Sequence, residues 1–119
     1  MIRREVDMLP ASADGGIQGF LRDNAAHISA MITIEESSQP ERVKFHVVNG
    51  LNQNVAITWY GCDEEDKSDA VALGPSPITY ATTVKDYETV SDPFIYYYFS
   101  VTAAGVPTSG QLKVHALWA

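Results

Sequence analysis

The densest group of residues that could do chemistry is the acidic stretch DEEDKSD, from Asp63 to Asp69. Its side chains are the kind of oxygen ligands that calcium prefers. Calcium-binding loops usually alternate their ligands with turn-forming residues, however, and this stretch has no DxDxDG spacing. Runs of like charge are more often simply exposed to water. We therefore expect a solvated hairpin loop here, with no metal and no cofactor.

The remaining candidates for catalysis are one cysteine and three histidines. A nucleophilic thiol needs a nearby base and an electropositive setting, whereas the acidic residues after Cys62 should raise the pKa of its thiol. No HxH or HExxH spacing joins His27, His46 and His115, and strand alternation places the last two opposite the apolar face of their strands. The sequence also lacks GxSxG, CxxC and a glycine loop before a helix. We therefore expect no enzyme activity and no catalytic residue.

Aromatic residues concentrate in PFIYYYFSV, residues 93–101. A strand with one buried face alternates apolar and polar residues, and this stretch does not. One set is predicted to face the core: Ile95, Tyr97, Phe99 and Val101. The other set is predicted to face outward and to need a cover: Phe94, Tyr96 and Tyr98. Because tyrosine joins a large ring to a polar tip, it suits a surface that meets a partner. Three covers stay open: another protein, a stacked sugar ring, or the chain's own arm or a long loop.

The elements that would position these groups are short β-rich stretches separated by turn residues. About seven strands at a spacing of roughly 8 to 12 residues are typical of a β-sandwich. The stretches are HISAMITIE (27–35), ERVKFHVV (41–48), VAITWYG (55–61), DAVAL (69–73), ITYATTV (78–84), PFIYYYFSV (93–101) and QLKVHALW (111–118). We expect an all-β fold, a single antiparallel β-sandwich of jelly-roll or immunoglobulin-like type, formed by residues 27–119.

Period-two alternation predicts which side chains of these strands are buried. The predicted core positions are Ile28, Ala30, Ile32 and Ile34 in the first stretch, Val43, Phe45 and Val47 in the second, Val55, Ile57 and Trp59 in the third, and Leu112, Val114, Ala116 and Trp118 in the last. Between them, NGLNQN (49–54) has the Asn and Gly residues of a hairpin connection. The polar stretch KDYETVSDP (85–93) is predicted to be turn-rich, and the prolines of GPSP (74–77) should stop strand pairing.

The first 26 residues differ from the rest and are predicted to form an N-terminal arm. They have no clear period-two pattern and contain Gly15, Gly16 and a short apolar cluster of Ile17, Phe20 and Leu21. Terminal segments are usually mobile unless something ties them down, but this one is more apolar than a solvated tail needs to be. Two interpretations stay open, an arm packed on its own domain and an arm laid across a neighbouring subunit.

Composition limits the partners. The chain has 119 residues, which fits one domain, and its net charge of −7 comes from eight Lys and Arg against fifteen Asp and Glu. An acidic chain is a poor partner for nucleic acid or for an anionic membrane. No apolar run approaches the roughly 20 residues that span a bilayer, and MIRREVDMLP has no apolar segment of signal-peptide length. A single cysteine cannot form an internal disulfide, which fits assembly in a reducing cytoplasm.

The C-terminal half resembles small β-sandwich structural proteins of tailed bacteriophages. VAITWYGCDEED resembles their strand followed by an acidic turn, and DPFIYYYFSVTAAGVPTSGQLKVHALW resembles their closing hairpin, whose last strand has the pattern GxLxVxxLW. The chain departs from the pattern at DEEDKSD, where the related hairpins more often have a glycine-containing turn followed by a tryptophan. Discoidin-like and other carbohydrate-binding sandwiches also end with an aromatic strand and a short final strand.

The resemblance implies a virion component, assembled in the host cytoplasm, of the head-decoration, minor capsid, neck or tail accessory type. Such a protein would form homo-oligomers or bind other virion structural proteins on a symmetric capsid or tail lattice. We expect the contacts to run through the arm and the aromatic face, at Ile17, Phe20, Leu21, Phe94, Tyr96 and Tyr98. The alternative is a carbohydrate-binding module that stacks a glycan on Tyr96 and Tyr98.

Overall fold

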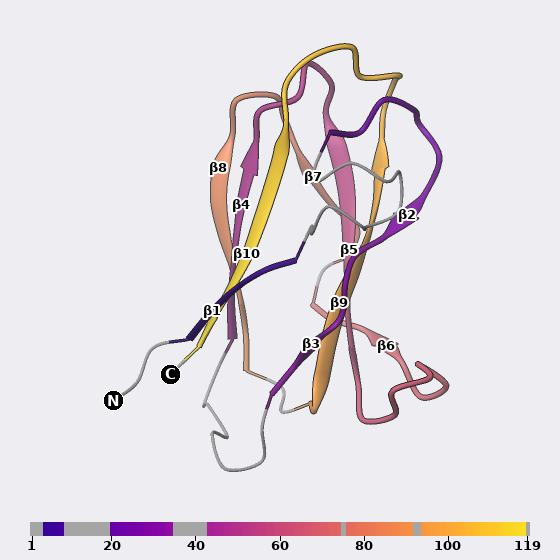
Figure 1. The fold of residues 1–119 in the computed structure, drawn as a ribbon, viewed down its shortest axis with the longest axis vertical. Helices are drawn as coiled ribbons and strands as arrows, with labels where there is room; N and C mark the ends of the chain where they lie inside the picture. Colours follow the sequence, from indigo (N-terminus) through magenta and orange to yellow (C-terminus); the bar gives the residue numbers. More distant parts are fainter. Residues whose placement is uncertain (1–3, 9–19, 35–42, 75, 92–93, 119) are drawn as a thin grey trace.

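Two antiparallel β-sheets packed face to face make up the computed structural model, which describes residues 4–8, 20–34, 43–74, 76–91 and 94–118 (Figure 1). The strands are β1 (Arg4–Asp7), β2 (His27–Ile28), β3 (Ile32–Thr33), β4 (Val43–Asn49), β5 (Val55–Cys62), β6 (Val71–Ala72), β7 (Ile78–Tyr80), β8 (Lys85–Val90), β9 (Tyr96–Ala103) and β10 (Leu112–Trp118). The predicted all-β sandwich is confirmed. In the described part of the chain, no helix is long and apolar enough to cross a membrane.

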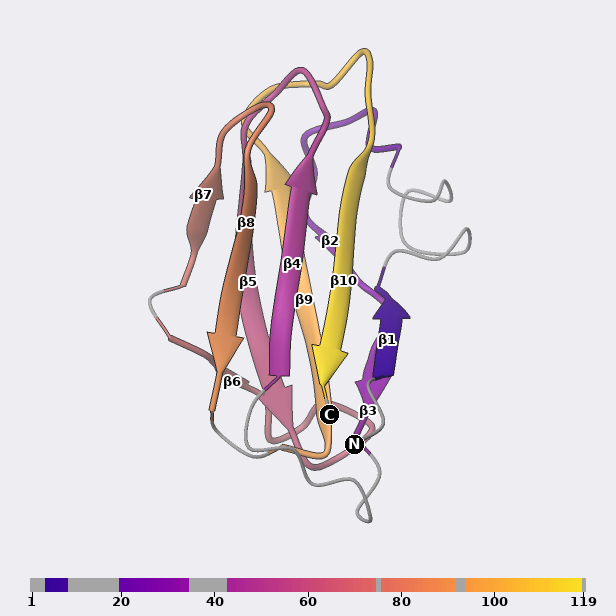
Figure 2. The same ribbon diagram turned by 90° about the vertical axis from the view of Figure 1, so that its left-hand side faces the viewer.

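The order of the strands is that of a jelly roll. Sheet A has the order β1-β10-β4-β8, and Figure 2 shows it facing the viewer. Sheet B has the order β2-β9-β5-β6, with β3 also paired to β9 and β7 to β5. The first half of the chain thus pairs with the second half in reverse: β1 with β10, β2 and β3 with β9, β4 with β8, and β5 with β7 and β6. Such a doubled ribbon, rolled into two sheets, is the jelly-roll architecture.

Two connections predicted as hairpins cross between the sheets instead. The segment after β4 leads from sheet A to β5 in sheet B, and the segment after β9 returns to β10 in sheet A. Asn49, fully buried at the end of β4, holds the first crossing. Its Nδ2 donates to the carbonyls of Gln53, Tyr80 and Ala81, and its Oδ1 accepts the N–H of Leu51. The Asn and Gly residues that suggested a hairpin therefore form a corner of the sandwich.

The core lies between the sheets and follows the predicted alternation in β4, β5 and β10. All of the predicted core positions in these three strands are buried, from Val43 to Trp118. The rings of Phe45 in sheet A and Trp59 in sheet B stack at the centre, with centroids 4.5 Å apart and planes at 19°. Offset ring contacts of this kind add to the free energy that burial alone supplies.

The alternation failed in the stretch predicted as one strand from His27. The structure has two short strands there, and the five residues from Ile28 to Ile32 lie opposite only four residues of β9, from Ser100 to Tyr97. One extra residue turns the following side chains to the opposite face. Ile28 is therefore 44% exposed, against the prediction, while Ile32 and Ile34 are buried as expected.

Two further predictions on the second half of the chain were wrong. Ile95 is 38% exposed and precedes β9, so it does not join Tyr97, Phe99 and Val101 in the core. The stretch predicted as turn-rich contains β8, which pairs with β4 at the edge of sheet A. An edge strand has one side open to water, so polar residues are compatible with it.

The described residues of the predicted arm pack on their own domain. β1 is an edge strand of sheet A, paired with the last residues of β10. Met8, which follows it, is fully buried, and its N–H donates to the carbonyl of Val114. Leu21 is 3% exposed and belongs to the core. These residues therefore follow the first of the two interpretations, an arm packed on its own domain.

Candidate interaction faces of the sandwich

The predicted contact residues of the arm do not form one surface. Leu21 is in the core, and Ile17 lies outside the described residues. Phe20 is 39% exposed, and the guanidinium of Arg22 lies 5.8 Å from the centre of its ring. Phe20 is therefore the described member of this set that is available to a partner.

The three aromatic residues predicted to point outward are also placed differently from one another. Tyr96 is half-buried on the outer side of sheet B. Phe94 folds over β5, where its ring lies directly against Gly61 and meets Tyr97 edge-on. Tyr98 is on the outer side as predicted, and it is only 7% exposed, so its ring is covered.

The cover of Tyr98 comes from the same chain. The ring of Tyr60 stacks on it at 4.9 Å with an interplanar angle of 12°, and the ammonium of Lys67 lies 4.8 Å from its centre. Lys67 belongs to the acidic loop between β5 and β6. Of the three covers left open from the sequence, a loop of the same chain covers this ring. Burial, with Cys62 and Tyr60 nearby, raises the pKa of Tyr98.

The loop from Asp63 to Asp69 joins two paired strands, as the predicted hairpin requires. Its aspartates hold its shape: Asp69 accepts the N–H groups of residues 63 and 64, Asp66 accepts that of Ser68, and Asp63 accepts that of Ile95. The hydrogen bonds from Ser68 lower the pKa of Asp66. Across the described ranges, no group of three His, Cys, Asp or Glu side chains could hold a metal ion.

Cys62 ends β5 and is buried. Burial raises the pKa of its thiol, and the carboxylates of Asp69 and Asp63 raise it further. Because the thiolate is the reactive form, this setting makes the cysteine a poor nucleophile. The direction predicted from the sequence is confirmed.

The outer side of sheet B is formed by strands without charged residues, and we call it the neutral face; Lys67 of the β5–β6 loop reaches it at Tyr98. The strands of sheet B contain no Asp, Glu, Lys or Arg, although the chain has 23 such residues, eight basic and fifteen acidic. Its central rows pair Tyr60 with Tyr98, Thr58 with Ser100 and Ala56 with Thr102. Exposed Ile28 and Thr33 extend it at one edge. Protein interfaces are depleted of charge at their centres, so this face suits a protein contact.

The outer side of sheet A is different and was not predicted as a site. Register places His115, His46 and Tyr87 in one row across β10, β4 and β8. The rings of His46 and Tyr87 stack at 4.3 Å with an interplanar angle of 11°. Lys44, Lys85 and Lys113 flank the row and are exposed. We call this surface the lysine-ring face. The histidines were correctly placed opposite the apolar faces of their strands, but nothing local in the sequence shows that they are neighbours.

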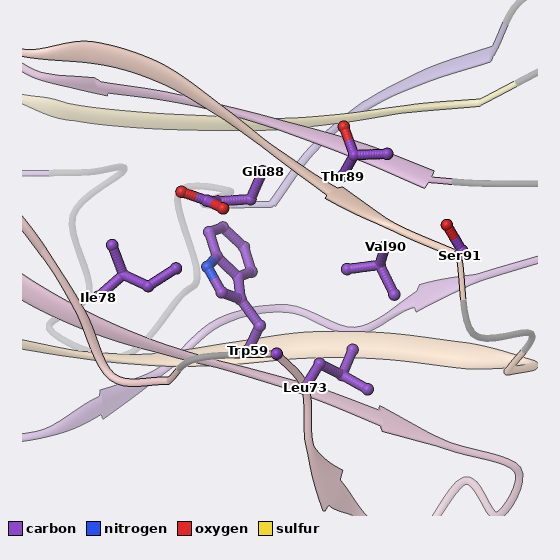
Figure 3. A pocket seen from close by; sticks show the side chains of 8 residues that line it. Trp59, Leu73, Ile78, Glu88, Thr89, Val90 and Ser91 are labelled. Carbon is purple, nitrogen blue, oxygen red and sulfur yellow. The ribbon is translucent and has the colours of Figure 1, made fainter.

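A small cavity opens where β8 faces β6 and β7 at the edge of the sandwich. Its volume is about 150 Å³, and Figure 3 shows Trp59 at its centre, with Ile78 on one side, Leu73 and Val90 on the other and Glu88 above. The Nε1 of Trp59 has no hydrogen-bond partner among the described residues, although the indole is close enough to the Tyr80 hydroxyl to favour its ionised form. The Tyr80 hydroxyl donates to Glu88 at 3.1 Å.

Comparison with known proteins identifies relatives in structure but not in sequence. No protein-family model matches the chain, and no curated protein matches its sequence. The PBSX exported protein XepA superposes with a TM-score of 0.65 at 11% identity, over 99% of this chain and 37% of XepA. PirA superposes with a TM-score of 0.51 at 6% identity, over 98% of this chain and 91% of PirA. A protein of the Bacillus endospore appendages, a family of disulfide-linked pili, gives 0.51 at 13% identity, over 99% and 87%.

These likenesses show a shared fold. At such low identity they do not carry the function of any neighbour to this chain. The chain spans only about a third of XepA, a phage-derived protein, so the activity of the whole of XepA says nothing of this domain.

Proposed function

We propose that this chain is a non-enzymatic structural protein of a phage-type particle, which assembles with copies of itself or with other structural proteins through the neutral face. The observation that carries the proposal is the absence of charged residues from every strand of sheet B. Strands without charged side chains avoid most of the cost of removing water from ions when two proteins meet. The resemblance of the C-terminal half and the phage-derived neighbour in structure support the setting in a virion.

The contact would centre on Thr58 and Ser100, which face each other on the two central strands and are half-buried. Tyr96 lies on the same side of β9, beyond Tyr98, and Ile28 extends the surface at its edge, opposite Ser100. Tyr98 contributes through its packing on Tyr60 rather than as an exposed ring.

The alternative, a carbohydrate-binding module, loses one of its two stacking platforms. A sugar ring needs the open face of an aromatic ring, and Tyr98 is only 7% exposed beneath its contacts with Tyr60 and Lys67. Tyr96 alone is a smaller platform than the sequence suggested. A glycan array with the wild-type protein tests this alternative directly.

The test of the proposed function is the double variant Thr58→Lys/Ser100→Lys. Two charges at the centre of the neutral face must lose water when a partner binds, so we expect association to weaken by about tenfold or more. Sedimentation velocity over a range of concentrations measures self-association, and cosedimentation with particles from the protein's own source measures binding to a lattice. Ser109→Lys, at an exposed loop position, adds one such charge away from both sheets and should change neither.

The wild-type protein is measured first, because its own association tests the proposed function directly. A protein that stays monomeric at high concentration and does not cosediment with particles from its source has no such function. If the double variant associates as strongly as the wild type, the contact is on a surface other than the neutral face.

A further inference from the structure

On β10, β4 and β8 the lysine-ring face carries only basic charged residues, although the chain is acidic. β1, at the edge of the same sheet, places Glu5 opposite Leu117 and Asp7 opposite His115, and it pairs with β10 only from residue 115 onward. Nine side chains point outward from β10, β4 and β8: Lys113, His115, Leu117, Lys44, His46, Val48, Lys85, Tyr87 and Thr89. None of them is acidic, although the whole chain has a net charge of −7. Three of the chain's four lysines are among them. A basic surface this concentrated on an acidic molecule is suited to an acidic partner.

The geometry of the rings favours carboxylates over a sugar ring. His46 and Tyr87 turn their faces toward each other, and the ammonium of Lys44 lies 4.9 Å from the centre of the Tyr87 ring. When two rings stack with their planes roughly perpendicular to the sheet, their edges face the solvent. The ring nitrogens of His46 and the hydroxyl of Tyr87 are on these edges. This face therefore offers hydrogen-bond donors and positive charge, and little open ring surface for stacking.

The matching acidic surface is on the same chain, at the β5–β6 hairpin. Three of its aspartates are engaged in hydrogen bonds that shape the loop. Glu64 and Glu65 are exposed, and within the described ranges their side chains form no hydrogen bond or ion pair. The lysines form no ion pair with a carboxylate there either. The three lysines of the face and the two glutamates of the loop therefore lie on separate surfaces, and within the described residues none of the five forms an ion pair.

We propose that the lysine-ring face of one copy binds the acidic β5–β6 loop of a second copy, with Glu64 and Glu65 set against Lys44, Lys85 and Lys113. The two surfaces are different, so the contact is heterologous, and repeated copies would form a ring or a filament. Because the charges are exposed, the contact should weaken as salt is added. The inference deepens the proposed structural role but uses a separate surface from the neutral face.

The experiment uses two variants that remove charge without reversing it. The face variant is Lys44→Gln/Lys85→Gln/Lys113→Gln, and the loop variant is Glu64→Gln/Glu65→Gln. At low ionic strength we expect each variant alone to lose at least about tenfold in the self-association constant, because several exposed ion pairs are removed together. Mixed one to one, they should form a heterodimer that grows no further, since only one intact face and one intact loop remain.

Sedimentation velocity and light scattering distinguish the outcomes. A mixture that stays monomeric overturns the proposal, and so does an undiminished self-association in either variant. If the face variant instead loses binding to polygalacturonate while self-association is unchanged, the occupant is a different polyanion and the second copy is excluded. Unchanged circular dichroism and melting temperature show that the variants are folded. The Thr58→Lys/Ser100→Lys protein separates the two contacts: it should retain the lysine-ring contact even if the neutral face proves to bind nothing.

Discussion

Asn49 shows how one buried side chain fixes the course of the chain between the two sheets. Its side chain donates to three carbonyls and accepts one N–H at the corner where the chain passes from sheet A to sheet B. Buried polar groups of the backbone need hydrogen-bond partners. Removing the Asn49 side chain would leave several of these backbone groups unpaired at once. The side chain is therefore part of the fold rather than of a binding surface.

We expect Asn49→Ala to lower the free energy of unfolding by about 3 kcal/mol, since each buried group left without a partner costs roughly 1 to 3 kcal/mol. Urea denaturation measures the change. The control is Asn52→Ala, three residues along, whose side chain bonds Thr108 at the exposed end of the sandwich. That change should cost less than about 1 kcal/mol. Equal losses in both variants would contradict the role of Asn49.

Tyr80 makes stability depend on pH in the alkaline range. Burial raises the pKa of this tyrosine, and the carboxylates of Glu88 and Asp86 oppose its ionisation further. The folded protein holds the phenolic proton at a pH where the unfolded chain, with an ordinary pKa of about 10, releases it. The stabilisation is therefore complete below about pH 10 and is lost as pH rises toward the folded pKa.

Above about pH 10, we expect the wild type to lose stability by up to about 1.4 kcal/mol per pH unit through this one group. Urea midpoints between pH 9 and 11.5 measure the slope, and Tyr80→Phe should flatten it. Part of the slope should persist, because the pKa of Tyr98 is raised as well. Parallel curves for the two proteins would show that Tyr80 does not ionise on unfolding in this range.

At the level of the strand, Phe94 and Gly61 form a fitted pair. The ring lies so close to β5 that a β-carbon at position 61 would collide with it. The same ring meets Tyr97 at a right angle, 6.0 Å between centroids, and the N–H of Phe94 donates to the Tyr97 hydroxyl. These contacts fix the entry into β9 and explain why a residue predicted to face a partner is half-buried.

We expect Gly61→Ala to destabilise the protein by about 1 to 3 kcal/mol, the usual result of overpacking. Phe94→Leu should destabilise it as well, but the double variant should be more stable than the sum of the two losses predicts, because the smaller side chain makes room for the methyl group. Thermal melting of the four proteins measures this coupling. Strict additivity would mean that the two residues do not constrain each other.

Alternation in the sequence was enough to predict the buried faces of β4, β5 and β10, because each of these strands has a partner on both sides and one face in the core. It failed at Ile28, because a single extra residue between Ile28 and Ile32 shifts the register against β9. Ser29 accommodates that shift by accepting the N–H of Phe99 on its hydroxyl. No local sequence pattern indicates such an inserted residue, so the register of β2 and β3 at the edge of sheet B could not be predicted from the sequence.

The candidate faces were predictable to different degrees. The lack of charge on the neutral face is visible in VAITWYGC and YYYFSVTA once these strands are known to be neighbours. The lysine-ring face depends on the pairing of His115 with His46 and of His46 with Tyr87, residues far apart in the chain. Sequence alone does not supply the register of distant strands.

For the whole molecule, the described arm residues are structural. β1 closes one edge of sheet A, and Met8 fills a fully buried position next to it. Without them, β10 would present an unpaired edge, which is a template for pairing with other chains.

Removing residues 1–8 should therefore lower stability by about 3 kcal/mol or more and promote aggregation. Met8→Ala is the matched variant: it removes the buried side chain and keeps β1, so we expect a loss of about 2 to 5 kcal/mol without aggregation. Melting curves and light scattering measure the two effects. A truncated protein that melts like the wild type and stays dispersed would place the arm outside the folded domain.

The doubled ribbon also has a consequence for synthesis. β9 and β10 are the last two strands of the domain to be made, yet each lies in the interior of its sheet, between two neighbours. A nascent chain that stops before residue 94 cannot complete either sheet, because β9 and β10 are missing from their interiors. Domains generally fold as units on the ribosome, and distant pairings form slowly. The domain should therefore appear only after β10 has emerged, so a shortened translation product would be unfolded and open to proteases rather than partly functional.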